Sequence, residues 1–329
     1  MSIRQVILGT DGAVHVETAA DPEPPAPGRV LLAPVRLGIC GSDVHVLDRR
    51  HPFVAPPVVT GHEGVARVLE TGADVTACAP GDLVVVNPLV TCGICDVCRT
   101  GPANRCAHAK VLGFALPGLA QDRLVVDQRY CHRVPDGLDD GVAVLTEPLA
   151  VGWHAVARVR HDLGRVLIIG GGPVGLSVLA AVVARGATHV TLAEPVATKR
   201  ELAKRLGADR VLTPDDTPEP VDTAFDCVAA APTLATSGAA TVPGGTLVCV
   251  GVPPGDTALP LARLQRWEID VLGTGLYVGA DLDAVLAHLS AGAPLVRELV
   301  TAAFPVERAA DAFAATRDPD QIKVTITWP

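Results

Sequence analysis

The pattern of apolar and polar residues divides the chain into two parts. Up to about residue 146, short apolar runs such as RVLLAPVRLGIC, GVARVLETG and GDLVVVNPLV are separated by Gly, Pro and Asp, which predicts β-strands joined by turns. From Val151 onward, segments with helical spacing alternate with continuous apolar runs. Alternating helices and buried strands predict an α/β domain in which helices cover both faces of a parallel sheet.

The alternation can be followed segment by segment in the second part. The pattern predicts strands for RVLIIG, HVTLAE, TAFDCVA and GTLVCVGV, and helices for WHAVARVRHD, GPVGLSVLAAVVARGA and TKRELAKRLGA. After about Tyr277 it predicts a longer helix (DLDAVLAHLSAG), a short helix (VERAADAFAATR) and a final strand (IKVTITW). The apolar segment EIDVLGTGLYV, from Glu268 to Val278, is typical of an edge strand of the parallel sheet.

Length and composition narrow the function classes. A chain of 329 residues is longer than one core usually supports, which predicts two domains. The net charge of −9 argues against a nucleic-acid partner, because such binding depends on clustered Lys and Arg. An aromatic content of only 3% also removes the stacking surfaces of single-strand binders.

The sequence carries no sign of export or membrane insertion. The start, MSIRQVILGTDG, lacks the apolar core and small-residue cleavage site of a signal peptide. Apolar stretches are broken by Gly, Pro or charge well before the ~20 residues that cross a membrane. We therefore expect a cytoplasmic protein, in which nine cysteines favour metal sites or free thiols over disulfides.

A glycine-rich turn predicts dinucleotide binding. In RVLIIGGGPVGLSVLAA, Gly170, Gly172 and Gly175 follow a predicted strand and open a predicted helix. The first glycine permits the tight turn, the second lets a pyrophosphate approach the backbone, and the third lets the helix pack on the strand. Free N–H groups at the start of the helix would face the phosphates.

The residue that ends the next strand favours NAD. Glu194 closes HVTLAE, where a carboxylate accepts hydrogen bonds from the adenosine ribose and repels a 2′-phosphate. Lys199 and Arg200 follow shortly after, and either cation can hold a 2′-phosphate. NADP therefore remains the alternative cofactor.

Four cysteines in one short segment predict a structural metal site. The segment CGICDVCRTGPANRC places Cys92, Cys95, Cys98 and Cys106 in a C-x2-C-x2-C-x7-C spacing. Four thiolates can enclose one tetrahedral ion and leave no position open for a substrate. Iron–sulfur clusters use related spacings, but the absence of a second such set favours zinc.

A second set of ligand-type residues is dispersed along the chain. One Cys, one His and one carboxylate are enough for a catalytic zinc that keeps its fourth position for water or substrate. Spacing alone does not bring the dispersed residues together. The candidates are Cys40, Ser42, Asp43 and His45 in LGICGSDVH, His62 and Glu63 in GHEG, and Glu147 in TEPLAVGWHA.

The motifs together resemble one enzyme family. GICGSDVH, GHEGVARV, the four-cysteine lobe, EPLAVGWHA, GGGPVGL and FPVERAADAF follow the order found in zinc-dependent medium-chain dehydrogenases, and look most like the sorbitol, threonine and butanediol dehydrogenase branch. The resemblance covers essentially the whole chain. It implies a GroES-like catalytic domain over residues 1–147 with a zinc lobe at about 88–110, a Rossmann NAD domain over 148–276, and a return to the catalytic domain over 277–329.

The resemblance also implies roles for the dispersed residues. Cys40 and His62 would bind a catalytic zinc, with Glu63 or Glu147 as the third ligand, and the two carboxylates are expected to share that role. Asp43 would orient His62. The proton would leave through the Ser42 hydroxyl, the cofactor ribose and His45 to solvent. These roles imply two zinc ions per chain and a homodimer or homotetramer.

Cofactor contacts are implied by position as well. The stretch 250–252 would lie under the nicotinamide half, and 273–276 would approach the nicotinamide amide. The residues concerned, besides the three motif glycines, are Val174, Glu194, Lys199, Val250, Gly251, Val252, Thr274, Gly275 and Leu276.

Two departures from the sorbitol dehydrogenase pattern bear on the substrate. Val46 stands where those enzymes have an aromatic residue, and Leu276-Tyr277 stands where they have an Arg-Tyr pair. An apolar replacement leaves substrate hydroxyls without partners, which costs about 1–3 kcal/mol for each missing hydrogen bond. Sorbitol itself is therefore not the expected substrate.

The expected function is hydride transfer between a secondary alcohol and NAD, which gives the ketone. The alcohol would be of the polyol, sugar or cyclitol type. One alternative is an NADP-dependent dehydrogenase of an amino-alcohol or aminocyclitol intermediate in biosynthesis. A zinc-free quinone or enoyl reductase lacks both ligand sets, and a zinc-ribbon binding module does not explain the glycine-rich turn.

Overall fold

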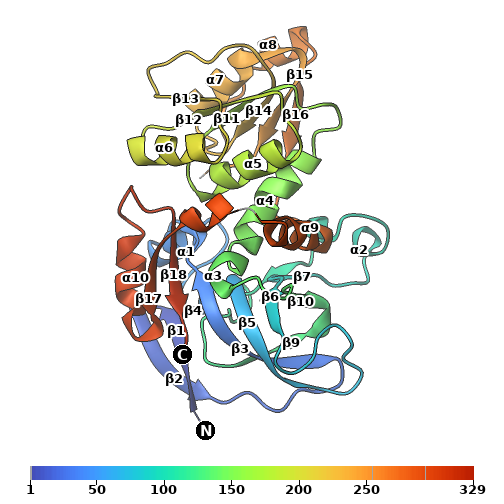
Figure 1. Cartoon of the computed structure of the whole chain (residues 1–329), viewed down its shortest axis with the longest axis vertical. Coiled ribbons are helices and arrows are strands. Elements are labelled where there is room, and N and C mark those ends of the chain that lie inside the picture. The colour runs from blue at the N-terminus through green and yellow to red at the C-terminus, as the bar shows by residue number, and fades with distance from the viewer. Residues whose placement is uncertain (1, 254, 293) are drawn as a thin grey trace. The chain divides into compact units, whose positions relative to one another are not determined.

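The chain forms two compact units. The structure is a computed structural model that describes residues 2–253, 255–292 and 294–329 (Figure 1). Unit 1 comprises Met1–Glu147 together with Val278–Pro329, and unit 2 comprises Pro148–Tyr277. The chain therefore leaves unit 1 within the first turn of α4 (Thr146–Ala157) and later returns to it.

Unit 1 is built on two β-sheets. The smaller has the strand order β2-β1-β4, and the larger has the order β10-β6-β5-β3-β18-β17, with β9 also pairing with β3. These strands are β1 (Ser2–Leu8), β2 (Val14–Ala20), β3 (Arg29–Gly38), β4 (Val58–Val59), β5 (Glu63–Thr71), β6 (Leu83–Val86), β9 (Leu124–Asp127), β10 (Cys131–Arg133), β17 (Val300–Pro305) and β18 (Lys323–Thr327).

The last strand of the chain completes the larger sheet. β18 pairs antiparallel with β3, with Thr325 opposite Gly38, and pairs parallel with β17. The predicted strand IKVTITW is thus confirmed. β17 was not predicted, because VTAAFP alternates between exposed and half-buried positions and carries only small or weakly apolar residues at most of them.

Short helices and one small hairpin complete unit 1. The helices are α1 (Gly41–Leu47), α2 (Asp96–Thr100), α3 (Asp140–Ala143), α9 (Gly279–Ser290) and α10 (Ala309–Ala315), and the hairpin strands are β7 (Leu89–Val90) and β8 (Lys110–Val111). Short 3-10 turns cover Ala103–Arg105, Gln128–Tyr130, Pro294–Leu299 and Val306–Arg308. The core between these elements includes the fully buried Leu8, Leu32 and Val46.

Unit 2 contains the predicted parallel sheet. Its strand order is β13-β12-β11-β14-β15-β16, and every pairing is parallel. The strands are β11 (Arg165–Ile169), β12 (His189–Ala193), β13 (Arg210–Leu212), β14 (Val221–Asp226), β15 (Thr241–Cys249) and β16 (Asp270–Gly273). Leu167, Ala224 and Leu247 lie opposite one another on three neighbouring strands and form the centre of the core.

Three helices of unit 2 overlap predicted helices, whereas the segments APTLATSGAA and LARLQR were not predicted to be helical. Besides α4, the helices are α5 (Pro173–Ala184), α6 (Ala197–Arg205), α7 (Ala231–Ala240) and α8 (Leu261–Arg266). The segment APTLATSGAA of α7 was not predicted, since it is rich in Thr, Ser, Gly and Pro, which favour helices weakly. α7 packs on β14 and β15, so tertiary contact outweighs the local preference.

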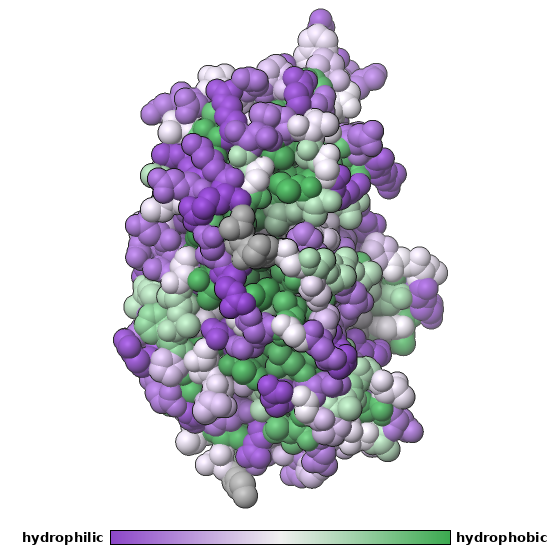
Figure 2. Space-filling view, in the orientation of Figure 1, coloured by the Kyte–Doolittle hydropathy of each residue, from purple (hydrophilic) through white to green (hydrophobic). Residues whose placement is uncertain are grey.

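The surface carries both polar and apolar side chains. Figure 2 shows polar side chains over much of one face, with smaller apolar areas between them. Within the described ranges, the longest apolar helices fall short of what a membrane crossing requires.

The turn between β11 and α5 depends on two glycines. Gly170 has φ +100°, a left-handed conformation that glycine adopts without strain. A Cβ on Gly175 would lie 1.8 Å from the carbonyl oxygen of Gly170, so the helix can approach the strand only without a side chain there. A Cβ on Gly172 would meet nothing within 4 Å.

The two helix-side glycines should therefore respond differently to alanine. Gly175→Ala should lower the free energy of unfolding by about 1–3 kcal/mol, because backbone must move to accept the methyl group. Gly172→Ala, the matched control, should leave stability nearly unchanged. Urea unfolding followed by circular dichroism would measure both, and equal stability of the two variants would contradict the packing role of Gly175.

Candidate functional site

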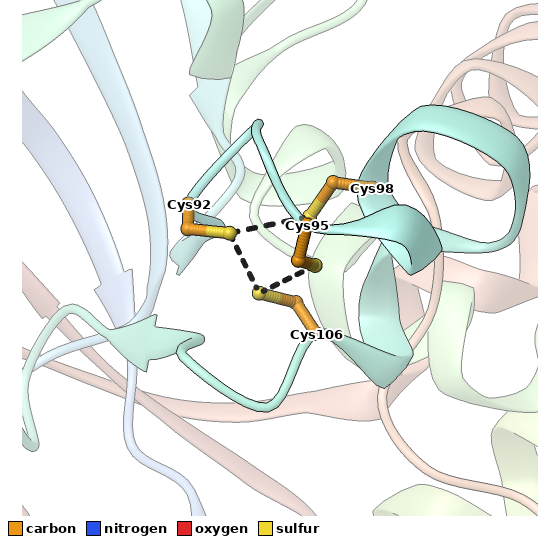
Figure 3. A group of neighbouring side chains, drawn as sticks. All are labelled: Cys92, Cys95, Cys98 and Cys106. Carbon is orange, nitrogen blue, oxygen red and sulfur yellow. Dashed lines mark hydrogen bonds between the residues drawn. The ribbon is translucent and has the colours of Figure 1, made fainter.

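Four cysteines of the predicted lobe converge in unit 1. Cys92, Cys95, Cys98 and Cys106 form what we call the thiolate cluster, in which all four sulfurs lie within 4.8 Å of one another. The Sγ–Sγ distances are 3.9 Å for Cys92 to Cys98, 3.9 Å for Cys95 to Cys106 and 3.6 Å for Cys92 to Cys106 (Figure 3). The sulfurs come from the loop after β7, from α2 and its N-cap, and from the segment before β8.

The sulfur separations fit a zinc ion. Zn–S bonds of about 2.3 Å in a tetrahedron place the sulfurs about 3.8 Å apart, which matches the spacing found here. The backbone N–H groups of Ile94 and Cys95 lower the pKa of Cys92 to about 6, whereas burial and the neighbouring thiols raise the pKa of Cys98 to about 11. Thiols must lose their protons to bind a metal ion, so metal binding at this cluster would release protons.

A second group of ligand atoms also lies in unit 1. Cys40, His62 and Glu63, which we call the mixed cluster, each offer one donor atom, and these atoms lie within 4.8 Å of one another. Cys40 follows β3 and caps α1, and His62 directly precedes β5, which begins at Glu63. Two adjacent residues can share one site because the chain turns into the strand between them.

Glycines around these residues make the close approach possible. Gly61 has φ +102°, and a Cβ there would lie 2.7 Å from a methyl group of Leu37 and 3.0 Å from the backbone nitrogen of Ala120. Gly38 lies opposite Glu63 in the sheet, and a Cβ on it would lie 2.2 Å from the Glu63 Oε2 atom. The Glu63 carboxylate thus occupies space that only glycine leaves open.

Asp43 joins Cys40 and His62 through a buried network. Its carboxylate accepts hydrogen bonds from the backbone N–H of Cys40 at 3.0 Å and from the Thr60 hydroxyl at 2.8 Å. His62 Nδ1 lies 3.4 Å from Asp43 Oδ1, which leaves Nε2 as the nitrogen for a metal. Burial by itself would lower the pKa of His62, but the Asp43 charge outweighs it and raises this pKa well above its usual value.

The carboxylate of Glu63 is paired with a lysine from the end of the chain. Lys323 Nζ donates to Glu63 Oε1 at 2.7 Å and to Oε2 at 2.6 Å, and both side chains are buried. Burial by itself would lower the pKa of Lys323, but the charge of Glu63 and its neighbours outweighs this effect and raises the pKa. The ammonium group therefore stays charged in the interior.

Glu147 is the other candidate carboxylate, and its role as a metal ligand stays a prediction. It is buried in the first turn of α4, and its charge acts on Lys323. Among the described residues, however, the group of converging ligand atoms contains Glu63 and not Glu147. The structure therefore brings one of the two candidate carboxylates directly to Cys40 and His62.

The proton-carrying candidates lie on α1. Ser42 and His45 are three residues apart, which places them on one side of the helix. Ser42 is half-buried and His45 is exposed, whereas Asp43, Val46 and Leu47 point into the protein. A hydroxyl near the cluster and an imidazole at the surface suit a path for protons outward.

An aromatic ring that sequence reasoning missed lies against His62. The Phe114 ring centroid is 4.9 Å from that of His62 and 5.0 Å from that of His51. Nothing in the local sequence marks Phe114, because its neighbours in the chain are ordinary loop residues. Lys323 carried a weak signal, since a lysine beginning an apolar final strand is unusual.

The predicted cofactor residues of unit 2 gather at one edge of its sheet. Gly170, Glu194, Val250 and Thr274 each follow or end a neighbouring parallel strand on the carboxyl side. The strand order reverses direction between β11 and β14, and such switch points are where dinucleotides bind in sheets of this kind.

Glu194 is fixed beside the glycine-rich turn. Its Oε2 accepts from the backbone N–H of Gly171 at 2.6 Å, and its Oε1 accepts from that of Val196 at 2.9 Å. The neighbouring Arg200 guanidinium donates to the backbone oxygens of Glu194 at 2.7 Å and Pro195 at 2.6 Å. Lys199 is half-buried on α6, and Val174 lies in the first turn of α5.

The remaining predicted residues differ in exposure. Val250 is buried and, like Gly251, donates its N–H to the backbone oxygen of Asp226, at 2.8 and 3.0 Å. Val252 is largely exposed, and Thr274 follows β16. Gly275 precedes Leu276, which is partly exposed and adopts a left-handed φ of +52°.

Comparison with protein families assigns both parts of the chain. Residues 26–136 match the alcohol dehydrogenase GroES-like domain, and residues 173–291 match the zinc-binding dehydrogenase domain. The first match covers the mixed and thiolate clusters, and the second begins directly after Gly172 and covers Gly175 and Glu194.

Individual relatives span nearly the whole chain. Sorbitol dehydrogenase of Gallus gallus is 32% identical over 98% of this chain and 95% of its own. The 2-dehydro-3-deoxy-L-galactonate 5-dehydrogenase of Pseudoalteromonas atlantica is 32% identical over 88% of each. A zinc-binding dehydrogenase of Sinorhizobium meliloti bound to NADP has a TM-score of 0.92, 28% identity and 99% coverage of both chains.

A further solved structure has the same fold. The 2R,3R-butanediol dehydrogenase of Bacillus subtilis has a TM-score of 0.90, 26% identity and 99% coverage of both chains. The predicted fold class, a GroES-like β-rich domain with a Rossmann-type parallel-sheet domain, is confirmed by these matches. The chain belongs to the zinc-dependent medium-chain alcohol dehydrogenase family, in the branch that contains the sorbitol dehydrogenases.

Proposed function

We propose that this chain is a zinc-dependent oxidoreductase that oxidises a secondary alcohol to a ketone with NAD. The observation that carries the proposal is the convergence of Cys40, His62 and Glu63 into one buried group of mixed ligand atoms. Three protein ligands of this kind leave one position for a substrate, unlike the closed thiolate cluster.

Different residues of unit 1 would have different roles in the reaction. A zinc ion bound at the mixed cluster would act as a Lewis acid that favours loss of the proton from the substrate hydroxyl. Asp43, whose carboxylate lies 3.4 Å from His62 Nδ1, would orient the ring so that Nε2 binds the metal. Ser42 would accept the substrate proton, and the exposed His45 would pass it to solvent. Phe114 would shield one face of His62 from water.

Unit 2 supplies the cofactor site in this proposal. The motif glycines leave the backbone N–H groups at the start of α5 open to a pyrophosphate. Glu194 presents its carboxylate beside that turn, where it would accept from the ribose hydroxyls. The segments 250–252 and 274–276 would bind the nicotinamide half. NAD is therefore proposed over NADP, although Arg200 lies nearby.

The substrate is proposed to be of the polyol, sugar or cyclitol type with fewer hydroxyls than sorbitol. Val46 is fully buried in the core of unit 1 and offers no polar atom to a substrate. Leu276 likewise gives an apolar side chain where an arginine would donate hydrogen bonds.

All nine cysteines are free, which fits a reducing compartment such as the cytoplasm.

Removal of metal should test the two clusters together. Mild chelation is expected to lower the zinc content from about two to about one per chain, because the mixed cluster exchanges a ligand and the thiolate cluster does not. NAD-coupled oxidation, first found by a screen of secondary alcohols, sugars and cyclitols, should disappear while the circular dichroism spectrum stays unchanged. Full activity at about one zinc per chain would contradict the proposal.

The proposed cofactor preference depends on Glu194. Glu194→Gln should lower the ratio of kcat/KM for NAD to that for NADP by at least about tenfold, because one charged hydrogen bond of about 1.5–3 kcal/mol is lost and a repelling charge is removed. Glu201→Gln, on the exposed face of α6, is the matched control. A wild-type enzyme that uses NADP equally well would show that this carboxylate does not select the cofactor.

We further propose that two chains pair through the edge of the unit 2 sheet. β16 ends the strand order, and Trp267, Val271 and Leu276 around it are all partly exposed. An open apolar edge promotes association, and two-fold pairing would satisfy its backbone groups.

A charge on this edge should prevent the pairing. Val271→Lys is expected to shift the mass measured by light scattering from a dimer or tetramer to the 33.9 kDa monomer. Leu69→Lys, at a similarly exposed position of β5, should leave the assembly unchanged. A monomeric wild-type chain at micromolar concentration would refute this assembly.

A further inference from the structure

Lys323 is a cation buried within contact of the mixed cluster. Its side chain is 3% exposed, and its Nζ donates to both carboxylate oxygens of Glu63 and to the backbone oxygen of Ile39 at 3.2 Å. An ammonium group has three donors, so these acceptors use its full capacity. Such a lysine is seldom buried unless it is paired.

The carboxylate of Glu63 faces two partners at once. One of its oxygens belongs to the group of ligand atoms that Cys40 and His62 complete, and both oxygens accept from Lys323. A carboxylate has about four lone-pair positions, so a metal ion and an ammonium group can draw on it together. Each of these cations weakens the attraction between the carboxylate and the other cation, because the two repel one another.

The position of the carboxylate is also fixed from the opposite side. A Cβ on Gly38 would lie 2.2 Å from Glu63 Oε2 and 3.2 Å from Lys323 Cδ. Glu63 and Gly38 are opposite one another in the β3–β5 pairing, and Thr325 lies opposite Gly38 on β18. The carboxylate therefore rests in a recess formed by three strands.

We propose that Lys323 is a positioning residue that competes with the metal for the Glu63 carboxylate and so keeps this ligand exchangeable during turnover. The inference rests on the proposed function, since it requires a metal ion bound by Cys40 and His62. Without Lys323, the buried carboxylate has the metal as its one strong cationic partner, because an unpaired buried charge is costly. Glu63 then becomes a permanent ligand.

Lys323→Met tests this competition in the holoenzyme. Zinc release from the mixed cluster to a chelator should become slower by at least about tenfold, and kcat should fall by about 10- to 100-fold, the range seen for partners of metal ligands. With cobalt placed in the mixed cluster after mild chelation, the visible absorption bands should change because the ligand set changes. Lys323→Arg should restore both release and turnover in part.

Two controls separate competition from a loss of structure. Arg36→Met removes another ion pair of the same sheet, that with Asp140, and should alter neither zinc release nor the cobalt bands. Lys323→Met combined with Glu63→Gln removes both charges, and its zinc release should return to that of Glu63→Gln alone. A purely structural lysine would instead make zinc release faster in every Lys323 variant.

A glycine variant gives the same test without loss of charge. Gly38→Ala displaces the end of the flexible Glu63 side chain rather than backbone, so the chain should still fold. It too should slow zinc release, and it replaces Lys323→Met if that variant does not fold. Unchanged or faster release in both variants, with unchanged cobalt bands, would overturn the inference alone. A wild-type mixed cluster that binds neither zinc nor cobalt would overturn the proposed function as well.

Discussion

The buried ion pair between Glu63 and Lys323 is the constraint on which the larger sheet and the site of unit 1 both depend. The two residues are 260 positions apart in the chain, and both are nearly inaccessible to water. Leaving either charge unpaired in the interior would cost several kcal/mol, so the last strand cannot leave the sheet without exposing or stranding a charge. The chain therefore returns to unit 1 for an electrostatic reason as well as to complete its sheet.

Backbone packing around His62 adds a second constraint. A Cβ on Gly118 would lie 2.1 Å from the Thr60 carbonyl oxygen, and one on Gly113 would lie 2.9 Å from the backbone nitrogen of Gly61. These glycines let the 113–118 stretch touch the backbone directly before His62. The backbone that carries His62 is thus held by main-chain contacts, and the Asp43 carboxylate lies 3.4 Å from the Nδ1 atom of its ring. Rigid placement of this kind is what a metal ligand needs.

Local sequence patterns predicted many of the secondary-structure elements and the thiolate cluster. They did not predict contacts between residues that lie far apart in the chain. The parallel sheet followed from alternating apolar runs, and the thiolate cluster followed from spacing within fifteen residues. The strand β17 and the helix α7 were missed, because their residues have weak preferences that packing overrides. The strand β13 and the helix α8 were missed as well, because each is too short to show a hydrophobic period. No local pattern relates Lys323 to Glu63, or Phe114 to His62, since each pair meets only when separate strands and loops come together.

The two clusters differ in how far apart their ligands lie along the chain. The thiolate cluster draws all its ligands from one short segment between two hairpin strands, so a metal ion can organise it with little help from the rest of the fold. The mixed cluster takes its ligands from the end of β3 and the start of β5, and Lys323 of β18 pairs with one of them, so the cluster is complete only once the large sheet has formed. Metal binding at this site therefore requires that unit 1 is folded. The metal affinity depends on the charges that the sheet brings together. The mixed cluster is thus an open site with an exchangeable ligand on a rigid sheet. The thiolate cluster is a closed site that would stabilise a lobe with little hydrophobic core of its own.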